Sequence, residues 1–277
     1  MRFSIITPSF RASDWLKLCV ASVADQGVSA EHIVQDAGSD DGTLDWLTTD
    51  SRVRAFVEKD LGMYDAINRG LNRATGDLLA YLNCDEQYLP GSLNVVSAFL
   101  DCHPDVDVVF GDVVMLDPKG QYLYHRKMQT PLLYHTWTCH LSTLSCATFF
   151  RRKIVLERGF QFDARLRDVG DGEWMVRLLR SGVRMASLGQ FTSAFTCTGA
   201  NMSAGANARR ENRELRESAP MWARWLRPAF VVQHRLRRWR GGMYAQAPFK
   251  FEIFSSTSPT QRVVHSVSKP SFHPPTG

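Results

Sequence analysis

The sequence predicts an α/β fold in which a mostly parallel sheet is flanked by helices, followed by a basic helical extension. Three observations lead to this prediction. Strand-like and helix-like segments alternate through the first 115 residues, which is typical of parallel strands joined by crossover helices. Residues 77–82 (DLLAYL) are too apolar for an exposed sheet edge. Ten arginines are concentrated in residues 209–240.

Each element of the first half follows from a local pattern. The β-rich residues 2–7 end at Pro8, and Ser13 can cap a helix whose apolar residues recur three and four positions apart. Pro90 marks the start of a later amphipathic helix. The expected strands are 2–7, 32–35, 53–58, 77–82 and 107–115. The expected helices begin near Ser13, Thr43, Tyr64 and Pro90.

The second half is less regular. The pattern loosens over residues 128–148, and residues 170–181 are predicted to be helical again. From about Asn207 the chain reads as a helical segment rich in Arg and Trp. The residues after 255 are polar and contain several prolines, so we expect a disordered tail there.

The composition is that of a globular protein. The 277 residues are 44% hydrophobic and 22% charged, with a formal net charge of +5, so a core can form without disulfides. The six cysteines are scattered, which predicts free thiols in a reducing compartment. Neither a signal-peptide pattern nor an apolar run of about 18 residues is visible. We therefore expect a cytoplasmic protein.

Acidic residues follow three of the predicted strands, at Asp36, at Glu58–Asp65 and at Asp85 with Glu86. Ligands of parallel sheets bind beyond the carboxyl ends of the strands. Carboxylates gathered there repel one another unless a cation or ligand donors compensate them. Mg²⁺ and Mn²⁺ take such oxygen ligands and leave positions for phosphate oxygens. The alternative is that these residues only form turns and helix caps.

Four segments stand out in chain order: ITPSF (6–10), EHIVQDAGSDDGT (31–43), EKDLGMYDAINRGLNRATGD (58–77) and LAYLNCDEQYLPGSL (79–93). Together they resemble the nucleotide-sugar-binding half of family 2 glycosyltransferases, which are inverting enzymes with the GT-A fold. The resemblance covers roughly residues 1–182. It implies a GT-A domain over 1–205, with a nucleotide-sugar-binding half (1–115) and an acceptor half (116–205). A basic helical extension (206–254) and a disordered tail (255–277) would follow.

The resemblance also implies residue roles. A divalent metal, Mn²⁺ or Mg²⁺, would be held by Asp85 and Glu86, where relatives often carry an Asp-x-Asp motif. A nucleoside diphosphate sugar, usually with uracil as its base, would be the donor. Asp36 would hydrogen-bond that base. The implied donor-binding residues are Thr7, Pro8, Ser9, Asp36, Gly38, Ser39, Lys59, Asp60, Asp65, Asn68, Asn83 and Asp85.

Inverting transfer needs a carboxylate that deprotonates the acceptor hydroxyl. The segment FDARLRDVGDGEWMVRLLRSG (162–182) resembles the acceptor-side stretch of the family, where an Asp at a helix start is the base. Asp171 is the first candidate and Glu173 the second. The alternative is that Asp171 only caps the helix.

Two further features leave alternatives open. The histidines His125, His135 and His140 are candidate metal ligands or ordinary polar packing. Residues 221–240 combine tryptophans with arginines, which suits an anionic membrane surface. A helix packed on the domain with a solvated Arg face is the alternative, and no recognition module points to nucleic acid.

The expected activity is therefore sugar transfer to a glycan or lipid-linked acceptor in surface polysaccharide biosynthesis, at the inner face of the cytoplasmic membrane. Two other classes compete. A nucleotidyltransferase or dinucleotide-dependent oxidoreductase is disfavoured because G-x-G-x-x-G is missing from the first strand-to-helix turn and no P-loop motif occurs. A non-catalytic nucleotide-sugar-binding protein is disfavoured because carboxylates are present at both candidate sites.

Overall fold

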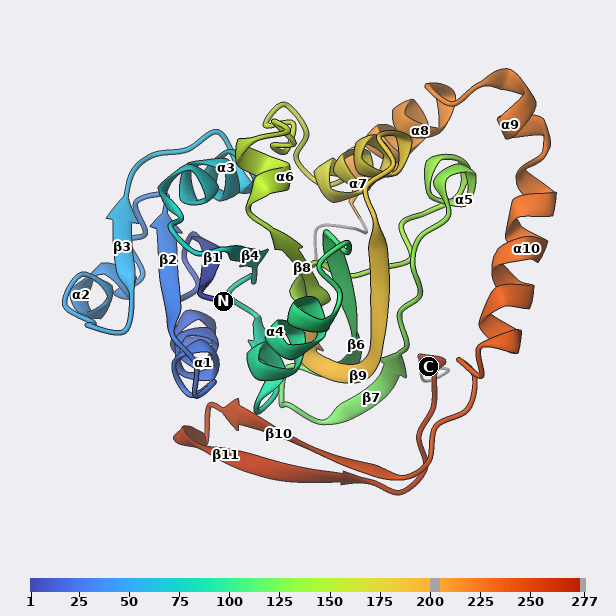
Figure 1. Ribbon diagram of the computed structural model, residues 1–277. Helices are drawn as coiled ribbons and strands as arrows, with labels where there is room; N and C mark the ends of the chain where they lie inside the picture. Colours follow the sequence, from blue (N-terminus) through green and yellow to red (C-terminus); the bar gives the residue numbers. More distant parts are fainter. Residues whose placement is uncertain (200–204, 275–277) are drawn as a thin grey trace.

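The computed structural model describes residues 1–199 and 205–274. In this part of the chain a nine-stranded sheet runs through the centre, with the order β3-β2-β1-β4-β8-β6-β9-β5 and β7 paired to β6 (Figure 1). The strands of the sheet are β1 (Phe3–Ser9), β2 (Ala30–Asp36), β3 (Arg54–Val57), β4 (Leu78–Tyr81), β5 (Glu86–Tyr88), β6 (Val108–Leu116), β7 (Tyr122–Arg126), β8 (Thr148–Arg151) and β9 (Met185–Thr196). The helices around it are α1 (Ser13–Ala24), α2 (Thr43–Leu47), α3 (Met63–Arg73), α4 (Ser92–Cys102), α5 (Leu133–Thr138), η1 (Ser145–Ala147), α6 (Lys153–Leu156) and α7 (Gly170–Arg180).

The first half of the sheet is parallel. Strands β3, β2, β1 and β4 are adjacent and point the same way. In this register Ser9, the last residue of β1, lies opposite Asp36, the last residue of β2. The loops that follow these strands therefore leave from the same edge of the sheet, where the sequence predicts the ligand site.

Helices cover both faces of this sheet. Ile6 and Thr7 are neighbours in β1, so their side chains point to opposite faces. Ile6 packs against α3 at Gly70, where an added Cβ would lie 2.4 Å from the Ile6 side chain. Thr7 points the other way, and its hydroxyl lies 3.6 Å from the Cys19 sulfur in α1. The predicted α/β sheet flanked by helices is confirmed.

The second half of the sheet adds antiparallel pairs that the sequence analysis did not anticipate. Strand β8 pairs antiparallel with both β4 and β6, while β9 runs parallel to β6 and antiparallel to β5. Both halves share one core, which includes large buried side chains such as Phe110, Phe149 and Trp174. All six cysteines are free thiols.

The basic segment is helical, as predicted. It forms α8 (Ala206–Glu217), α9 (Met221–Trp225) and α10 (Arg227–Arg240). Pro228 stands in the first turn of α10, where proline is tolerated, and the chain turns just before it. Figure 1 shows α9 and α10 as an arm along one side of the molecule, where α10 packs on α5.

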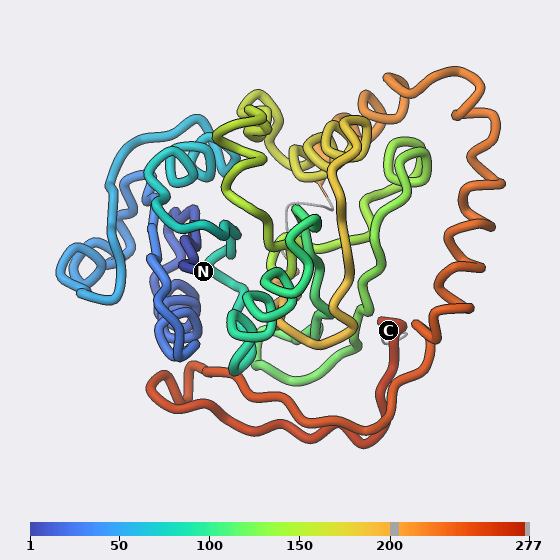
Figure 2. The backbone as a smooth tube through the Cα atoms, viewed as in Figure 1, coloured from blue at the N-terminus to red at the C-terminus, as the bar shows by residue number. Residues whose placement is uncertain are grey.

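The predicted disordered tail is wrong, and the helical extension ends earlier than residue 254. Strands β10 (Phe249–Ser255) and β11 (Ser258–Val267) form an antiparallel hairpin, which Figure 2 traces from α10 along the sheet domain towards α1. Phe249, Phe251 and Ile253 alternate with polar residues in β10, and Phe251 and Ile253 pack into a cluster with Val114. Arg262 forms an ion pair with Asp25 at 2.6 Å. These contacts order residues that look polar in sequence.

Candidate active site

The loop after β2 is built around Asp36. This carboxylate is fully buried and accepts hydrogen bonds from the hydroxyls of Ser9 and Ser39, both at 2.8 Å. It also accepts the backbone N–H groups of Gly38 (2.9 Å) and Ser39 (2.7 Å). Gly38 has φ 93°, a conformation that favours glycine. Four of the predicted residues thus form one polar loop at the end of β1 and β2.

The loop after β3 brings two more carboxylates to this edge. Asp60 accepts the backbone N–H of Gly62 at 2.9 Å. Burial raises the pKa of Asp60, and the carboxylates of Asp65 and Asp36 add to the shift, so the three acids lie close enough to interact. Asp65 forms an ion pair with Arg69 at 2.8 Å. The loops after β2 and β3 therefore carry acidic residues that interact with one another.

Some predicted donor-binding residues have their polar groups occupied by the fold. The Thr7 side chain is fully buried, with its hydroxyl 2.9 Å from the His32 ring. The Asn68 amide donates to the carbonyl of Phe162 (2.8 Å) and accepts its N–H (2.9 Å). The carbonyl of Pro8 accepts the Cys84 thiol at 3.3 Å. Lys59, in contrast, is exposed.

Asp85 and Glu86 follow the buried strand β4. The Glu86 side chain is fully buried and accepts the Asn83 N–H (2.7 Å) and the Ser145 hydroxyl (3.2 Å). Burial raises the pKa of Glu86 to about 8, and the neighbouring Asp85 carboxylate adds to the shift. Burial also raises the pKa of Asp85.

This set of oxygen atoms fits a divalent cation. Two adjacent carboxylates in a buried setting are costly while both are charged, and a hard cation relieves that cost. The side-chain oxygen of Asn83 is buried without a hydrogen-bond partner, so it is one more oxygen beside the pair. Both oxygens of Glu86 already accept hydrogen bonds, which leaves fewer lone pairs on Glu86 for a cation.

Two buried side chains connect the loops. Burial raises the pKa of the Cys84 thiol to about 12, and the carboxylates of Asp85 and Asp36 contribute to the shift. Burial likewise raises the pKa of Tyr81, with Asp171 and Glu86 among the contributing charges. Asp171 and Glu86 thus both act on Tyr81, and Asp85 and Asp36 both act on Cys84.

Asp171 lies in the first turn of α7 beside Tyr64 of α3. The Tyr64 hydroxyl donates to the Asp171 carboxylate at 3.3 Å and accepts its backbone N–H at 3.1 Å. Burial raises the pKa of Asp171. Gly170 makes this contact possible, because an added Cβ would lie 2.6 Å from the Tyr64 ring. Glu173, the second candidate base, is engaged in an ion pair with Arg177 at 2.7 Å.

The structure also reveals supporting residues that sequence reasoning missed. Glu211 in α8 is buried and accepts the backbone N–H groups of Arg167 (2.9 Å), Asp168 (2.9 Å) and Val169 (3.0 Å). It thereby holds the turn that leads into Asp171. Tyr64 and Ser145 contact the predicted acids directly. The sequence carried no signal for these roles, since the partners are distant along the chain.

The histidines divide into two groups. His125 is packed beside Tyr122, whose hydroxyl lies 2.9 Å from its Nδ1. His135 and His140 lie together with His234 of α10, and one ring nitrogen from each falls within 4.8 Å of the others. This cluster lies between α5 and α10 and is not part of the acidic site.

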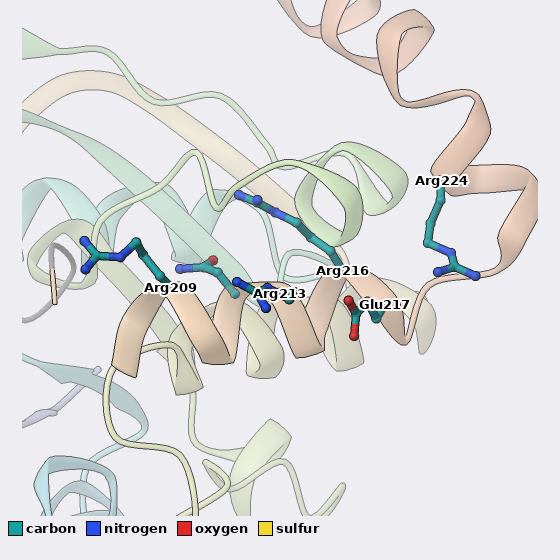
Figure 3. A pocket seen from close by; sticks show the side chains of 6 residues that line it. Arg209, Arg213, Arg216, Glu217 and Arg224 are labelled. Carbon is teal, nitrogen blue, oxygen red and sulfur yellow. The ribbon is translucent and has the colours of Figure 1, made fainter. Parts of the chain in front are cut away.

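The basic helices present their arginines on an open surface. A shallow hollow of about 440 Å³ lies along α8 and α9, and Figure 3 shows Arg209, Arg213 and Arg216 following one another on α8 with Arg224 on α9. Several large apolar side chains beside them are exposed: Met221, Trp222, Trp225, Leu226, Val232, Leu236 and Trp239. Among the described helices, none has the length and apolar character needed to span a bilayer.

Comparison with known proteins agrees with this architecture. A family model described as glycosyl transferase family 2 matches residues 4–160. A protein of Mycobacterium bovis named PGL/p-HBAD biosynthesis glycosyltransferase is 32% identical over 182 residues, which cover 63% of this chain and 68% of the relative.

Solved structures share the fold. Staphylococcus aureus TarS (residues 1–349), crystallised with UDP-GlcNAc, aligns with a TM-score of 0.61 at 18% identity, over 87% of this chain and 75% of that one. The mannosyltransferase PcManGT of Pyrobaculum calidifontis, in complex with GDP-Man and Mn²⁺, aligns with a TM-score of 0.52 at 18% identity, over 76% and 60%. The family model and the sequence relative identify the chain as a member of glycosyl transferase family 2, a glycosyltransferase with the GT-A fold.

Proposed function

We propose that the protein transfers a sugar from a nucleoside diphosphate sugar, with UDP as the favoured nucleotide, to a hydroxyl of a glycan or lipid-linked acceptor, with inversion at the anomeric carbon. The observation that carries this proposal is the position of Asp171. It is a buried carboxylate with a raised pKa that, like Glu86, acts on the buried Tyr81, and it is held by Tyr64. The name of the mycobacterial relative, a biosynthetic glycosyltransferase, supports a glycan or glycolipid product.

Asp171 is the proposed base. Its carboxylate takes the proton of the acceptor hydroxyl while that oxygen forms a bond to the anomeric carbon of the donor sugar. The bond from this carbon to the diphosphate oxygen breaks, and the nucleoside diphosphate leaves with the electron pair. A pKa above the usual aspartate range makes Asp171 a stronger base. The Tyr64 hydroxyl orients the carboxylate.

The donor is proposed to bind at the loops after β1, β2 and β4. Ser9, Gly38 and Ser39 shape the nucleotide side through their bonds to Asp36. Asp85, with Asn83 and Glu86 beside it, would hold a divalent cation, Mn²⁺ or Mg²⁺. When bound, such a cation neutralises charge on the departing diphosphate. The solved structure of PcManGT is a complex with GDP-Man and Mn²⁺, which supports this assignment.

We further propose that the protein works at the inner face of the cytoplasmic membrane. Trp222, Trp225 and Trp239 are exposed on α9 and α10 among arginines. Tryptophan suits the headgroup layer, and arginine is attracted to anionic lipids. The exposed side chains support a peripheral contact, which would bring a lipid-linked acceptor to the domain.

A panel of nucleoside diphosphate sugars tests the catalytic proposal. With Mn²⁺ or Mg²⁺ present, at least one donor should release its nucleoside diphosphate. Replacing Asp171 by Asn should lower turnover by roughly 10²- to 10⁴-fold while UDP affinity stays within about twofold. The matched control, Asp163→Asn, changes an aspartate on the same segment that pairs with Arg165 and should keep its turnover. Turnover by Asp171→Asn at the native rate would refute the assigned base.

A further inference from the structure

A second cavity, outside the acidic site, lies where α10 meets the sheet domain. Its volume is about 340 Å³. Arg126 at the end of β7 and His140 after α5 form one side, and His234, Arg235 and Arg238 of α10 form the other. Figure 1 shows α10 standing beside α5 at this place. Arginine and histidine thus supply five of the ten lining residues, and the others are Tyr124, Ser142, Tyr244, Phe272 and Pro274.

In the part of the chain that the structure describes, no carboxylate pairs with the arginines of this cavity. Within residues 1–199 and 205–274, neither Arg126 nor Arg235 nor Arg238 forms an ion pair with a carboxylate. Arg126 donates to the carbonyl of Ser142 at 3.4 Å, and Arg238 donates to that of Lys127 at 3.2 Å.

Burial makes this imbalance costly. Burial lowers the pKa of Arg126, and the nearby Arg238 lowers it further. The buried Arg262, in contrast, is paired with Asp25 in a bidentate contact. A desolvated guanidinium without an anion is unfavourable, and guanidinium groups match the geometry of phosphate and carboxylate. Arg262 thus has an anionic partner, whereas the arginines of the cavity have none among the described residues.

The histidine cluster beside the cavity does not explain it as a metal site. The rings of His135 and His234 are stacked, with centroids 4.0 Å apart and planes inclined by 15°. Their lone pairs lie in nearly parallel planes and cannot converge on one ion without ring rotation. Four arginines (Arg126, Arg216, Arg227 and Arg238) also act on His140 and help to lower its pKa, after burial. This field repels a cation and attracts an anion.

One loop joins the cavity to the acidic site. It carries His140 at the cavity and Ser145, which donates to Glu86. Cys146 follows Ser145 in this loop, and burial is the main cause of its raised pKa. The Glu86 and Asp85 carboxylates raise this pKa further, whereas Arg126 lowers it. The loop from His140 to Ser145 therefore connects the lining of the cavity with the Glu86 carboxylate.

We propose that this cavity binds a phosphate group carried by the acceptor substrate. The inference rests on the proposed glycosyltransferase function and assigns a chemical class to its acceptor: a phosphate ester or diphosphate. The other face of α10 carries the exposed Val232, Leu236 and Trp239. These residues lie about half a turn away from His234 and Arg238 on the helix. The helix can thus meet a lipid surface on one face and a headgroup phosphate on the other.

Titration of inorganic phosphate into the full chain, with EDTA present to exclude metal-bound phosphate, tests the proposal. Saturable binding is expected, and Arg238→Gln should weaken it at least tenfold. Arg235→Gln, at an exposed position of the same cavity, is a second variant in case Arg238→Gln does not fold. Arg165→Gln, an arginine with 90% of its side chain exposed, is the control and should bind phosphate normally. Equal affinity in all variants, or no saturable binding, overturns the proposal.

Two more measurements distinguish a lipid phosphate from a water-soluble one, and a phosphate site from a metal site. If Arg238→Gln loses binding to phosphatidic acid vesicles, the phosphate belongs to a lipid. If Arg238→Gln loses binding to inorganic phosphate but still binds these vesicles, the phosphate belongs to a water-soluble acceptor. Stoichiometric Zn²⁺ binding that His234→Gln abolishes would overturn the proposal in favour of a metal site. UDP affinity with Mn²⁺ should be unchanged in Arg238→Gln. If the native chain turns over no nucleoside diphosphate sugar but still binds phosphate, the proposed function is wrong and the anion site is supported.

Discussion

At the scale of single residues, the pair Asp171 and Tyr64 explains how a buried carboxylate can serve as a base. Burial raises the pKa of Asp171, whereas the hydrogen bond from Tyr64 lowers it. The two effects together keep the carboxylate available as a proton acceptor. The same hydroxyl receives the Asp171 N–H, so Tyr64 also fixes the start of α7.

Removing this hydroxyl has a predictable effect on the pH profile. In Tyr64→Phe the charged form of Asp171 loses a donor, so its pKa rises further. Because the base must be deprotonated, activity should then be lost at a higher pH as the solution is acidified. We expect kcat/KM to fall several-fold on the acid side and least at alkaline pH. The measurement is a profile of log kcat/KM against pH. Tyr134→Phe is the control, and an unshifted acid limb would contradict this role.

The residues of the site were only partly predictable. Asp36, Asp85 and Asp171 follow strand ends or begin a helix, and that local position can be read from a sequence. Tyr64 and Glu211 act on a turn that is 107 and 42 to 44 residues away along the chain. Such partners are brought together only by the packing of α3, α7 and α8, and no local pattern announces them.

At the scale of elements, α8 supports the proposed base through the turn before α7. Glu211 in α8 accepts three backbone N–H groups of this turn. In Glu211→Gln the side-chain N–H₂ group faces at least one of these backbone N–H groups, which then lacks an acceptor. An unsatisfied buried N–H costs about 1–3 kcal/mol. We expect Glu211→Gln to lower kcat while the Kd for UDP stays constant. Glu214→Gln, an exposed residue of the same helix, should leave both constants unchanged. A parallel loss of UDP affinity in Glu211→Gln would argue for general unfolding instead.

The C-terminal hairpin is the element that the sequence analysis misjudged. Its apolar residues alternate with Lys, Glu, Arg and Ser, so the average composition is polar and resembles that of a tail. The partners of those apolar residues lie on β6 and β9 and on the segment after β5. Alternation within β10 was the available signal. The β-α alternation of the first 115 residues was easier to predict because the hydrophobic periodicity of each element can be read within the element itself.

The free energy of unfolding of two hairpin variants tests whether the hairpin packs on the domain as described. Ile253 is fully buried in the hairpin cluster, so Ile253→Ala should lower the free energy of unfolding by about 2–5 kcal/mol. Val264, on the partner strand, is 56% exposed, and Val264→Ala should change it by less than about 0.5 kcal/mol. Urea unfolding of the full chain followed by tryptophan fluorescence gives both values. Equal stability of the two variants would mean that the hairpin does not pack as described.

At the scale of the whole molecule, the charge distribution separates two surfaces. Acidic loops gather at one edge of the sheet, while arginines and exposed tryptophans lie on α8, α9 and α10. The arm of α9 and α10 lies beside the domain and not over the acidic loops (Figure 1). We therefore expect the proposed donor site and the proposed membrane face to be independent, so that each can be altered without the other.

The double variant Trp225→Ala with Trp239→Ala tests that independence. It removes two of the most exposed aromatic side chains, which are 78% and 68% exposed. We expect several-fold weaker co-sedimentation with phosphatidylglycerol vesicles and an unchanged Kd for UDP. Leu156→Ala, an exposed apolar residue at the end of α6, is the control. Native binding to these vesicles by the double variant would exclude the arm as the membrane contact.

The central claim is that the acidic strand ends form one metal-dependent site for a nucleoside diphosphate, with Asp171 beside it but not part of it. Calorimetric titration of UDP in the presence of Mn²⁺ tests this claim most directly. The account predicts one UDP per chain, loss of binding on adding EDTA or in Asp85→Asn, and native affinity in Asp171→Asn. UDP binding that survives both EDTA and Asp85→Asn, or no binding by the native chain, would contradict it.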